Sequence, residues 1–283
     1  MRRRRAEEVL FRTLMIGSVA IVVGVLLTIV IMVTWKGLPA LNIAMITQTP
    51  KGGYYLGGGG GILNAIVGSL YLAAGATVLA FLLSLPVALF LQREYVKKSW
   101  LAGLIRLSMD ILWGIPSIVY GAFGFIIMLY LGIRASLLGG IIALTLLEIP
   151  VMVRAMDEVI RTVPQSLKDA SYSLGATRLE TSIRVVAKQV APGILTAVLL
   201  AFGRGIGDAA AILFTAGYTD RIPTSLFDPV ASLPLAVFFQ LGTPFPEVQQ
   251  RAYASAVILL LIILLISVAL RLLSKRLSKH TIK

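Results

Sequence analysis

Six long apolar segments are the feature that most constrains the fold of this 283-residue chain. Each has enough residues to cross about 30 Å of hydrocarbon as a helix that rises about 1.5 Å per residue. Because hydrocarbon offers no water to the backbone, the spanning segments must be helices rather than open sheets. The sequence therefore predicts an all-α membrane protein with six transmembrane helices. The predicted spans are Leu14–Trp35, Ile62–Leu91, Leu104–Leu131, Leu137–Val153, Gly193–Tyr218 and Tyr253–Leu273.

The composition excludes several classes of function. The chain is 58% hydrophobic and only 14% charged, whereas soluble domains carry roughly 25% charged residues. It has no cysteine and one histidine, which removes thiol chemistry, disulfides and multi-histidine metal sites. A G-x-x-x-x-G-K-[ST] phosphate loop is also missing. We therefore expect a transport subunit without catalytic, metal or cofactor-binding residues, and not an enzyme.

The basic residues report membrane topology. Of 26 lysines and arginines, 20 lie in the N-terminal arm, the second and fourth connections and the C-terminal tail. Connections rich in lysine and arginine stay in the cytoplasm, so both termini are predicted to be cytoplasmic in a multi-pass protein of the cell membrane. The formal charge of +13 is spread between apolar runs, which favours topology over nucleic-acid binding.

The chain divides into three regions. Residues 1–61 comprise the N-terminal arm, the first span and an external glycine-rich loop, whose stretch Lys51–Gly61 is predicted to be a flexible linker. Residues 62–273 form the transmembrane domain, with a cytoplasmic loop at 161–192, and residues 274–283 form a basic tail. In the last outer connection, Leu233–Leu241 is predicted to be a short helix.

The cytoplasmic loop contains a predicted helix between Pro164, which suits a helix start, and Gly175, which suits a helix end. The helical period places four of its residues on one small, mostly apolar face, namely Leu167, Ala170, Ser171 and Leu174. Such a helix suits insertion into a groove on a soluble partner, or it packs on its own bundle. The composition leaves both possibilities open.

A second helix is predicted to follow directly. Thr177 and Glu180 have the spacing of a capping box. The helical period then predicts a buried face made by Leu179, Ile183, Val186 and Val190.

The motif D-A-S-x-x-x-G at Asp169–Gly175 resembles the E-A-A-x-x-x-G motif of bacterial ATP-binding-cassette (ABC) importer permeases. In that family this segment is the coupling helix, which docks into the nucleotide-binding subunit. The resemblance implies that Asp169, Ala170, Ser171 and Gly175 belong to the docking element, and we expect Leu167 and Leu174 of the same helix to take part in the coupling.

Four longer stretches extend the resemblance, and in order and spacing they are most similar to A-type permease subunits of phosphate importers. The resemblance implies a type I importer bundle with a sister permease, an external phosphate-binding protein and an ATPase dimer that holds ATP and magnesium. A permease for molybdate, tungstate or sulfate, or the C-type phosphate permease, is the alternative, and an ion-coupled secondary transporter or a scaffold is a more distant one. The stretches are Gly60–Leu70, Gly114–Gly124, Val163–Arg178 and Pro192–Ala210.

Two charged residues, Arg204 and Asp208, lie inside the fifth predicted span. Burying either near the bilayer centre costs roughly 2.5–3.5 kcal/mol, so both are expected to face the bundle interior. Their spacing of four residues lets them pair on one helix face. We expect them to line a translocation pathway, with Arg204 offering its donors to an oxyanion; a static salt bridge is the alternative.

Two further acids, Asp110 and Glu148, lie in or near predicted spans. Pairing with a basic side chain or a partner subunit is one possible role. Solvation at a helix end is the favoured expectation for both.

Overall fold

The computed structural model describes residues 2–54, 57–92 and 99–277. Every regular element in these ranges is helical, and Pro50 and Gly60 form an isolated β-bridge. The elements are α1 (Arg2–Gly37), η1 (Leu38–Ala40), α2 (Ile43–Thr47), α3 (Leu63–Phe90), α4 (Ser99–Gly114), α5 (Ser117–Tyr130), α6 (Leu137–Arg161), α7 (Gln165–Ser173), α8 (Arg178–Glu180), the π-helical turn η3 (Thr181–Val186), α9 (Ala187–Gln189), α10 (Ala191–Gly207), α11 (Leu233–Leu241) and α12 (Pro246–Leu277).

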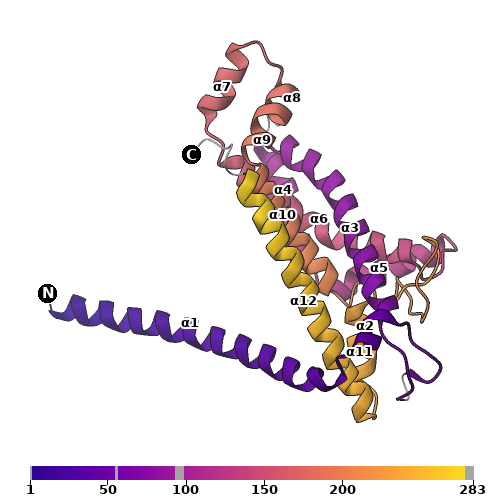
Figure 1. Ribbon diagram of the computed structural model, residues 1–283. Coiled ribbons are helices and arrows are strands. Elements are labelled where there is room, and N and C mark those ends of the chain that lie inside the picture. The colour runs from indigo at the N-terminus through magenta and orange to yellow at the C-terminus, as the bar shows by residue number, and fades with distance from the viewer. Residues whose placement is uncertain (1, 55–56, 93–98, 278–283) are drawn as a thin grey trace.

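Helix α6 is the centre of the bundle. It packs on α3, α10, α4 and α5, while α12 packs on α10 and α11. Helices α7 and α8 lie at one end of the bundle, and α2 and α11 lie at the other (Figure 1). The end of α12 returns to the α7 end, where Ser274 Oγ donates to the Pro192 carbonyl at 3.4 Å. The basic tail and the loop 161–192 therefore start from the same end of the bundle.

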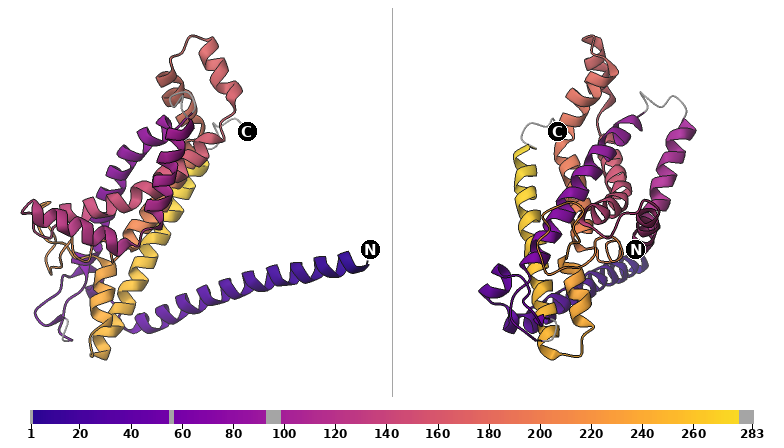
Figure 2. Two further views of the ribbon diagram at one scale, coloured as in Figure 1. Left: turned by 180° about the vertical axis from the view of Figure 1, so that it is seen from behind. Right: turned by 90° about the vertical axis from the view of Figure 1, so that its right-hand side faces the viewer.

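Helix α1 leaves the bundle and projects away from it in Figure 1 and in the left view of Figure 2. The most apolar window of Glu7–Ala40 is 0% buried. The end of α1 contacts α12, where Gly37 packs against the backbone of Tyr253 and Ala254. The Lys36 ammonium also lies 5.1 Å from the centre of the Tyr253 ring. An apolar surface of this size is stable against lipid or another apolar subunit.

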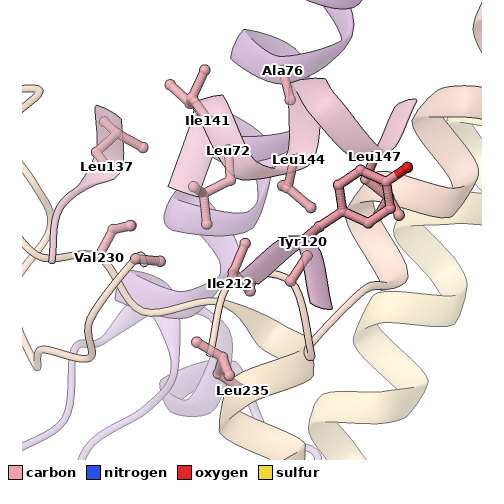
Figure 3. Packing of buried hydrophobic residues seen from close by; sticks show 12 residues of the cluster. Leu72, Ala76, Tyr120, Leu137, Ile141, Leu144, Leu147, Ile212, Val230 and Leu235 are labelled. Carbon is pink, nitrogen blue, oxygen red and sulfur yellow. The ribbon is translucent and has the colours of Figure 1, made fainter. Parts of the chain in front are cut away.

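The main hydrophobic cluster lies where α3, α5 and α6 meet the segment that follows α10 (Figure 3). Leu72 of α3 and Leu144 of α6 are each 1% exposed, and Ile212 reaches the same cluster from outside any helix. The cluster therefore holds a non-helical segment against two long helices.

Four helices are long and apolar enough to cross a membrane, and there are six spans if two bent pairs each count as one. The segment predicted as the third span, Leu104–Leu131, is divided into two helices. Trp100–Gly114 and Ser117–Tyr130 meet at 98°. The break lies at Pro116, which has φ −58° and ψ 139° and cannot donate a backbone hydrogen bond.

The prediction of a helical span at Gly193–Tyr218 is right for the first half of the segment and wrong for the second half. Helix α10 ends at Gly207, and Asp208 has an extended backbone with ψ 123°. Its Oδ1 accepts a 2.7 Å hydrogen bond from the Ala211 amide and starts a run of turns. The side chain of an aspartate competes with helix continuation in this way.

The glycine-rich loop, which the sequence predicts to be a flexible linker, packs into the bundle at Tyr54. Tyr54 is 1% exposed, and burial raises its pKa to about 12. Arg251 of α12 stacks on its ring at 4.5 Å and donates to its carbonyl at 2.8 Å. The short helix predicted at Leu233–Leu241 is confirmed as α11.

A charged cluster joins α4 to α6 on the side of the bundle nearest α7. The Asp157 carboxylate, 0% exposed, accepts from Arg106 Nε at 2.7 Å and lies 3.5 Å from Arg154. Arg154 also pairs with Asp110 at 2.6 Å. The alternative named for Asp110, pairing with a basic side chain, is therefore confirmed, and the Asp110 side chain stays 48% exposed.

Removing the buried acid tests this cluster. Asp157→Ala leaves the guanidinium groups of Arg106 and Arg154 without their shared partner and is expected to destabilise the chain by about 3 kcal/mol. Thermal unfolding of the chain in detergent measures the loss. The matched control is Glu158→Ala. Glu158 is 61% exposed, and its ion pairs with Arg154 at 3.8 Å and Arg161 at 3.7 Å are longer than the 2.7 Å pair of Asp157. Equal stability of the two variants would contradict this role for Asp157.

Candidate functional site: an exposed helix and an intramembrane arginine

Helix α7 is closed at its end by Gly175, as the sequence predicts. Gly175 has φ +82°, a backbone region that side chains with a Cβ rarely adopt. The Gly175 amide donates to the Tyr172 carbonyl at 2.9 Å, and the Ala176 amide donates to the Ser171 carbonyl at 3.2 Å. This pair of hydrogen bonds stops the helix within one residue and turns the chain back.

The four residues expected on one face of α7 are divided between two sides. Leu167 packs against the buried cluster of α6 and α10, and Ser171 is 9% exposed. The Ser171 and Thr181 hydroxyls form a 2.9 Å hydrogen bond, which ties α7 to the π-helical turn η3. Ala170 is exposed, and Leu174 is 89% exposed. The side that faces solvent therefore carries Ala170 and Leu174.

The acid of the motif also faces solvent. Asp169 is exposed, and its carboxylate accepts from the Gln165 amide at 3.1 Å, one turn earlier. Its backbone carbonyl accepts from the Ser173 hydroxyl at 3.0 Å. Asp169 thus lies beside Ala170 on the outer surface of α7.

The capping box predicted for the next helix is confirmed. The Glu180 amide donates to Thr177 Oγ1 at 3.3 Å, and the Thr177 amide donates to Glu180 Oε2 at 3.0 Å. The hydrogen bond from the Thr177 amide, reinforced by its hydroxyl, lowers the pKa of the Glu180 carboxyl. The box therefore stays intact at neutral pH and weakens only as the pH falls through that lowered value.

The buried face predicted for this helix is half wrong. Val186 and Val190 are 2% and 6% exposed, but Leu179 and Ile183 are 61% and 51% exposed. The reason is the π-helical turn η3, whose wider period breaks the 3.6-residue register. Besides Val186, the buried residues of this turn are Thr181, which bonds Ser171 of α7, and Ser182. Two large apolar side chains are thereby left on the surface of the loop.

A hollow of about 350 Å³ opens between α7 and the segment that follows it. Its lining is Ser171, Leu174, Gly175, Ala176, Glu180, Arg184 and Val185. The loop thus presents exposed apolar side chains beside a concave surface.

Arg204 and Asp208 do not form the pair that the sequence predicts. Arg204 lies in the last turn of α10 and Asp208 follows the end of that helix, so they no longer share a helix face. Within residues 99–277 no ion pair joins them. Arg204 instead lies within electrostatic range of Tyr120, whose hydroxyl donates to the Leu112 carbonyl at 2.8 Å.

One residue of this region was missed by sequence reasoning. Glu148 was expected to be solvated at a helix end, but it lies in the middle of α6 and is 0% exposed. Its Oε1 lies against Gly205, where any side chain would collide with it. Gly205 thus allows α10 to pack closely on α6 at this point. The only sequence signal for Glu148 was an acid within an apolar run.

The comparisons with known proteins identify the family. Residues 84–279 match the model of the family described as binding-protein-dependent transport system inner membrane component. The chain belongs to this family. The match includes α7, the charged cluster, Glu148 and Arg204, so the features described above lie within the inner-membrane component itself.

Three relatives of this inner-membrane component are named permeases. The chain is 36% identical over 237 residues to the phosphate transport system permease protein PstA of Yersinia pestis, covering 83% of this chain and 79% of the relative. It is 35% identical to PstA 1 of Mycobacterium tuberculosis (strain CDC 1551 / Oshkosh), and the match covers 74% of this chain and 69% of the relative. It is 31% identical to the probable ABC transporter permease protein YqgI of Bacillus subtilis, and the match covers 89% of this chain and 88% of the relative.

A solved structure shows the same fold. A chain of the MetNI methionine ABC transporter, in an inward-facing conformation, superposes with a TM-score of 0.62 at 18% identity. The match covers 76% of this chain and 95% of that chain. The inner-membrane component therefore has the fold of an ABC importer permease.

The helix stop at Gly175 can be tested by substitution. Gly175→Ala is expected to destabilise the end of α7 by roughly 1 kcal/mol, because φ +82° is strained for alanine. Nothing lies within 4 Å of the added Cβ, so the effect comes from the backbone alone. Amide hydrogen exchange of residues 165–176 measures it. Gly175→Asn is the control, since asparagine tolerates this backbone region; equally fast exchange in wild type and Gly175→Ala would contradict the assignment.

Proposed function

We propose that the chain is the membrane-spanning permease subunit of an ATP-driven phosphate importer. The support is its family membership together with relatives that are named phosphate transport system permeases at 31–36% identity. In this proposal it forms the translocation pathway with a sister permease. An external phosphate-binding protein delivers the substrate, and a separate ATPase dimer supplies the energy and holds ATP and magnesium.

Helix α7 is the proposed coupling helix. The observation that carries this role is the exposure of Leu174, Leu179 and Ile183 on a loop whose fold is fixed by caps and buried hydroxyls. Large apolar side chains in water are unfavourable unless a partner covers them. Asp169, Ala170 and Leu174 would contact the ATPase, while Leu167, Ser171 and Gly175 would hold α7 in place.

The proposal includes six spans with both termini in the cytoplasm. The support is that 20 of 26 basic residues belong to connections on one side. The bent pair α4–α5 then counts as the third span and α10 as the fifth. The loop 161–192 would face the cytoplasmic ATPase, and the end that carries α2 and α11 would face the binding protein.

Arg204 is the proposed anion contact of the pathway. A guanidinium offers five donors in a fixed fork that matches the oxygens of a phosphate. Its position in the last turn of α10, without an ion pair to Asp208, leaves these donors available to a passing anion. Asp208 would not contact the anion itself. It would position Arg204 by ending α10 directly after it, through the hydrogen bond that its side chain accepts from the Ala211 amide.

Uptake of radiolabelled phosphate by the assembled transporter tests this role. Arg204→Ala is expected to lower uptake by roughly 10- to 100-fold, because a hydrogen bond to a charged group contributes about 1.5–3 kcal/mol. Assembly with the partner subunits should be retained. Arg134→Ala is the matched control, since Arg134 is exposed in the connection between α5 and α6.

Two outcomes would contradict the proposal. Full phosphate uptake by Arg204→Ala would remove Arg204 from the pathway. Wild-type uptake of sulfate or molybdate in preference to phosphate would leave the importer mechanism in place but replace its substrate.

A further inference from the structure

Glu148 is a carboxyl group enclosed by three helices. It lies near the middle of α6 and is 0% exposed. Thr77 faces it from α3, and Gly205 of α10 lies against its Oε1. Neither carboxyl oxygen, nor the Thr77 hydroxyl, has a hydrogen bond of regular geometry to any part of the chain that the structure describes. Three polar atoms from facing helices are thus buried together without a partner.

A carboxylate in this position would be an isolated charge. Burying an ionised group without a partner costs far more than burying a neutral one, and proteins avoid the charge by changing its protonation state. A neutral carboxyl group also gains a donor, the acid O–H, which the ionised form lacks. The Thr77 hydroxyl is a single donor and cannot serve both carboxyl oxygens, so the acid O–H adds a second donor to this group of three atoms.

The charges on neighbouring helices do not neutralise Glu148. Helix α3 presents Thr77, which does not titrate, and α10 presents Gly205, beside Arg204. No ion pair links Arg204 to Glu148 in residues 99–277. The nearest ionisable group of α5, Tyr120, donates its hydroxyl proton to a backbone carbonyl.

The remaining charges that face α6 are already paired. Arg106 of α4 binds Asp157, and Asp110 of α4 binds Arg154. Both pairs lie at least one and a half turns beyond Glu148 along α6, at about 3.6 residues per turn. Glu158 and Arg161, farther along α6, lie 3.7 Å from one another.

We propose that Glu148 is a proton-binding site at the junction of α3, α6 and α10. The carboxylate takes up one proton from water and becomes a neutral acid that can donate to Thr77 Oγ1. In the packing seen here the proton is retained, because Gly205 closes the site from the side of α10. Release of the proton requires α10 to move away from α6.

This site couples proton binding to the position of α10. Gly205 is adjacent to Arg204, so any displacement of the arginine along or about α10 also displaces the wall of the proton site. The consequence for transport rests on the proposed function of Arg204. Whether Glu148 is protonated does not depend on that proposed function. The protonation of Glu148 can be measured without measuring transport.

Infrared difference spectroscopy measures the proton directly. The wild-type complex with its partner subunits is reconstituted in lipid nanodiscs and compared with Glu148→Gln, which keeps the shape and removes the acid. The difference is expected to contain the carbonyl stretch of a protonated carboxyl at neutral pH. Glu158→Gln is the matched control on the same helix, because Glu158 is 61% exposed; it should remove carboxylate bands alone. Glu148→Leu should remove the same band as Glu148→Gln.

A carboxylate signal from Glu148 at neutral pH would overturn the proposal. The coupling to α10 has its own test, the dependence of phosphate uptake on pH. Uptake by the wild type should decline more steeply on the alkaline side than uptake by Glu148→Gln, which has no proton to lose. Superimposable pH profiles would overturn the coupling. A complex that carries another anion would still show the carboxyl band, so failure of the phosphate proposal is distinguishable from failure of this one.

Discussion

Satisfying the backbone inside hydrocarbon is the constraint on which the rest of this structure depends. Continuous helices meet it by themselves, but α10 ends at Gly207 in the middle of an apolar run. The turns that follow are stable because other parts of the chain supply hydrogen-bond partners for their backbone groups. The Ser136 amide donates to the Thr215 carbonyl at 2.9 Å, and the Val230 amide donates to the Ala216 carbonyl at 2.9 Å. Non-helical backbone at this depth is tolerated only where protein surrounds it, and such positions form binding sites in many transporters.

The same constraint separates the molecule into parts with different roles. The polar side chains that are paired, such as Asp157 with Arg106, lock α4 to α6 near the α7 end of the bundle. Arg204 and Glu148, for which the described part of the chain shows no ion pair, lie where α10 meets α6 and α5. The first group makes a rigid base for the loop that carries α7. The second group lies at the interface whose movement would open or close a pathway.

Local patterns in the sequence predicted local structure well. The capping box at Thr177 and the helix at Leu233–Leu241 depend on neighbours in the chain, and both are present. The break after Gly207 was missed because an apolar helix and an apolar run of turns have the same hydropathy. The turns are stabilised by hydrogen bonds to residues distant in the sequence, which hydropathy does not report. The exposure of Leu179 was missed because a π-helical turn follows it and changes the helical register. Glu148 was misplaced because the sequence does not reveal depth within a span.

The central claim is that α7 is the surface through which a separate ATPase acts on this chain. The chain contains no cysteine, so Leu174→Cys provides a single attachment point for a photo-reactive crosslinker in the assembled transporter. The proposed docking predicts capture of the ATP-binding subunit from this position, and none from Leu27→Cys, on the exposed surface of α1. Failure of position 174 to capture that subunit, or its labelling by a membrane-impermeant reagent from outside intact cells, would contradict it.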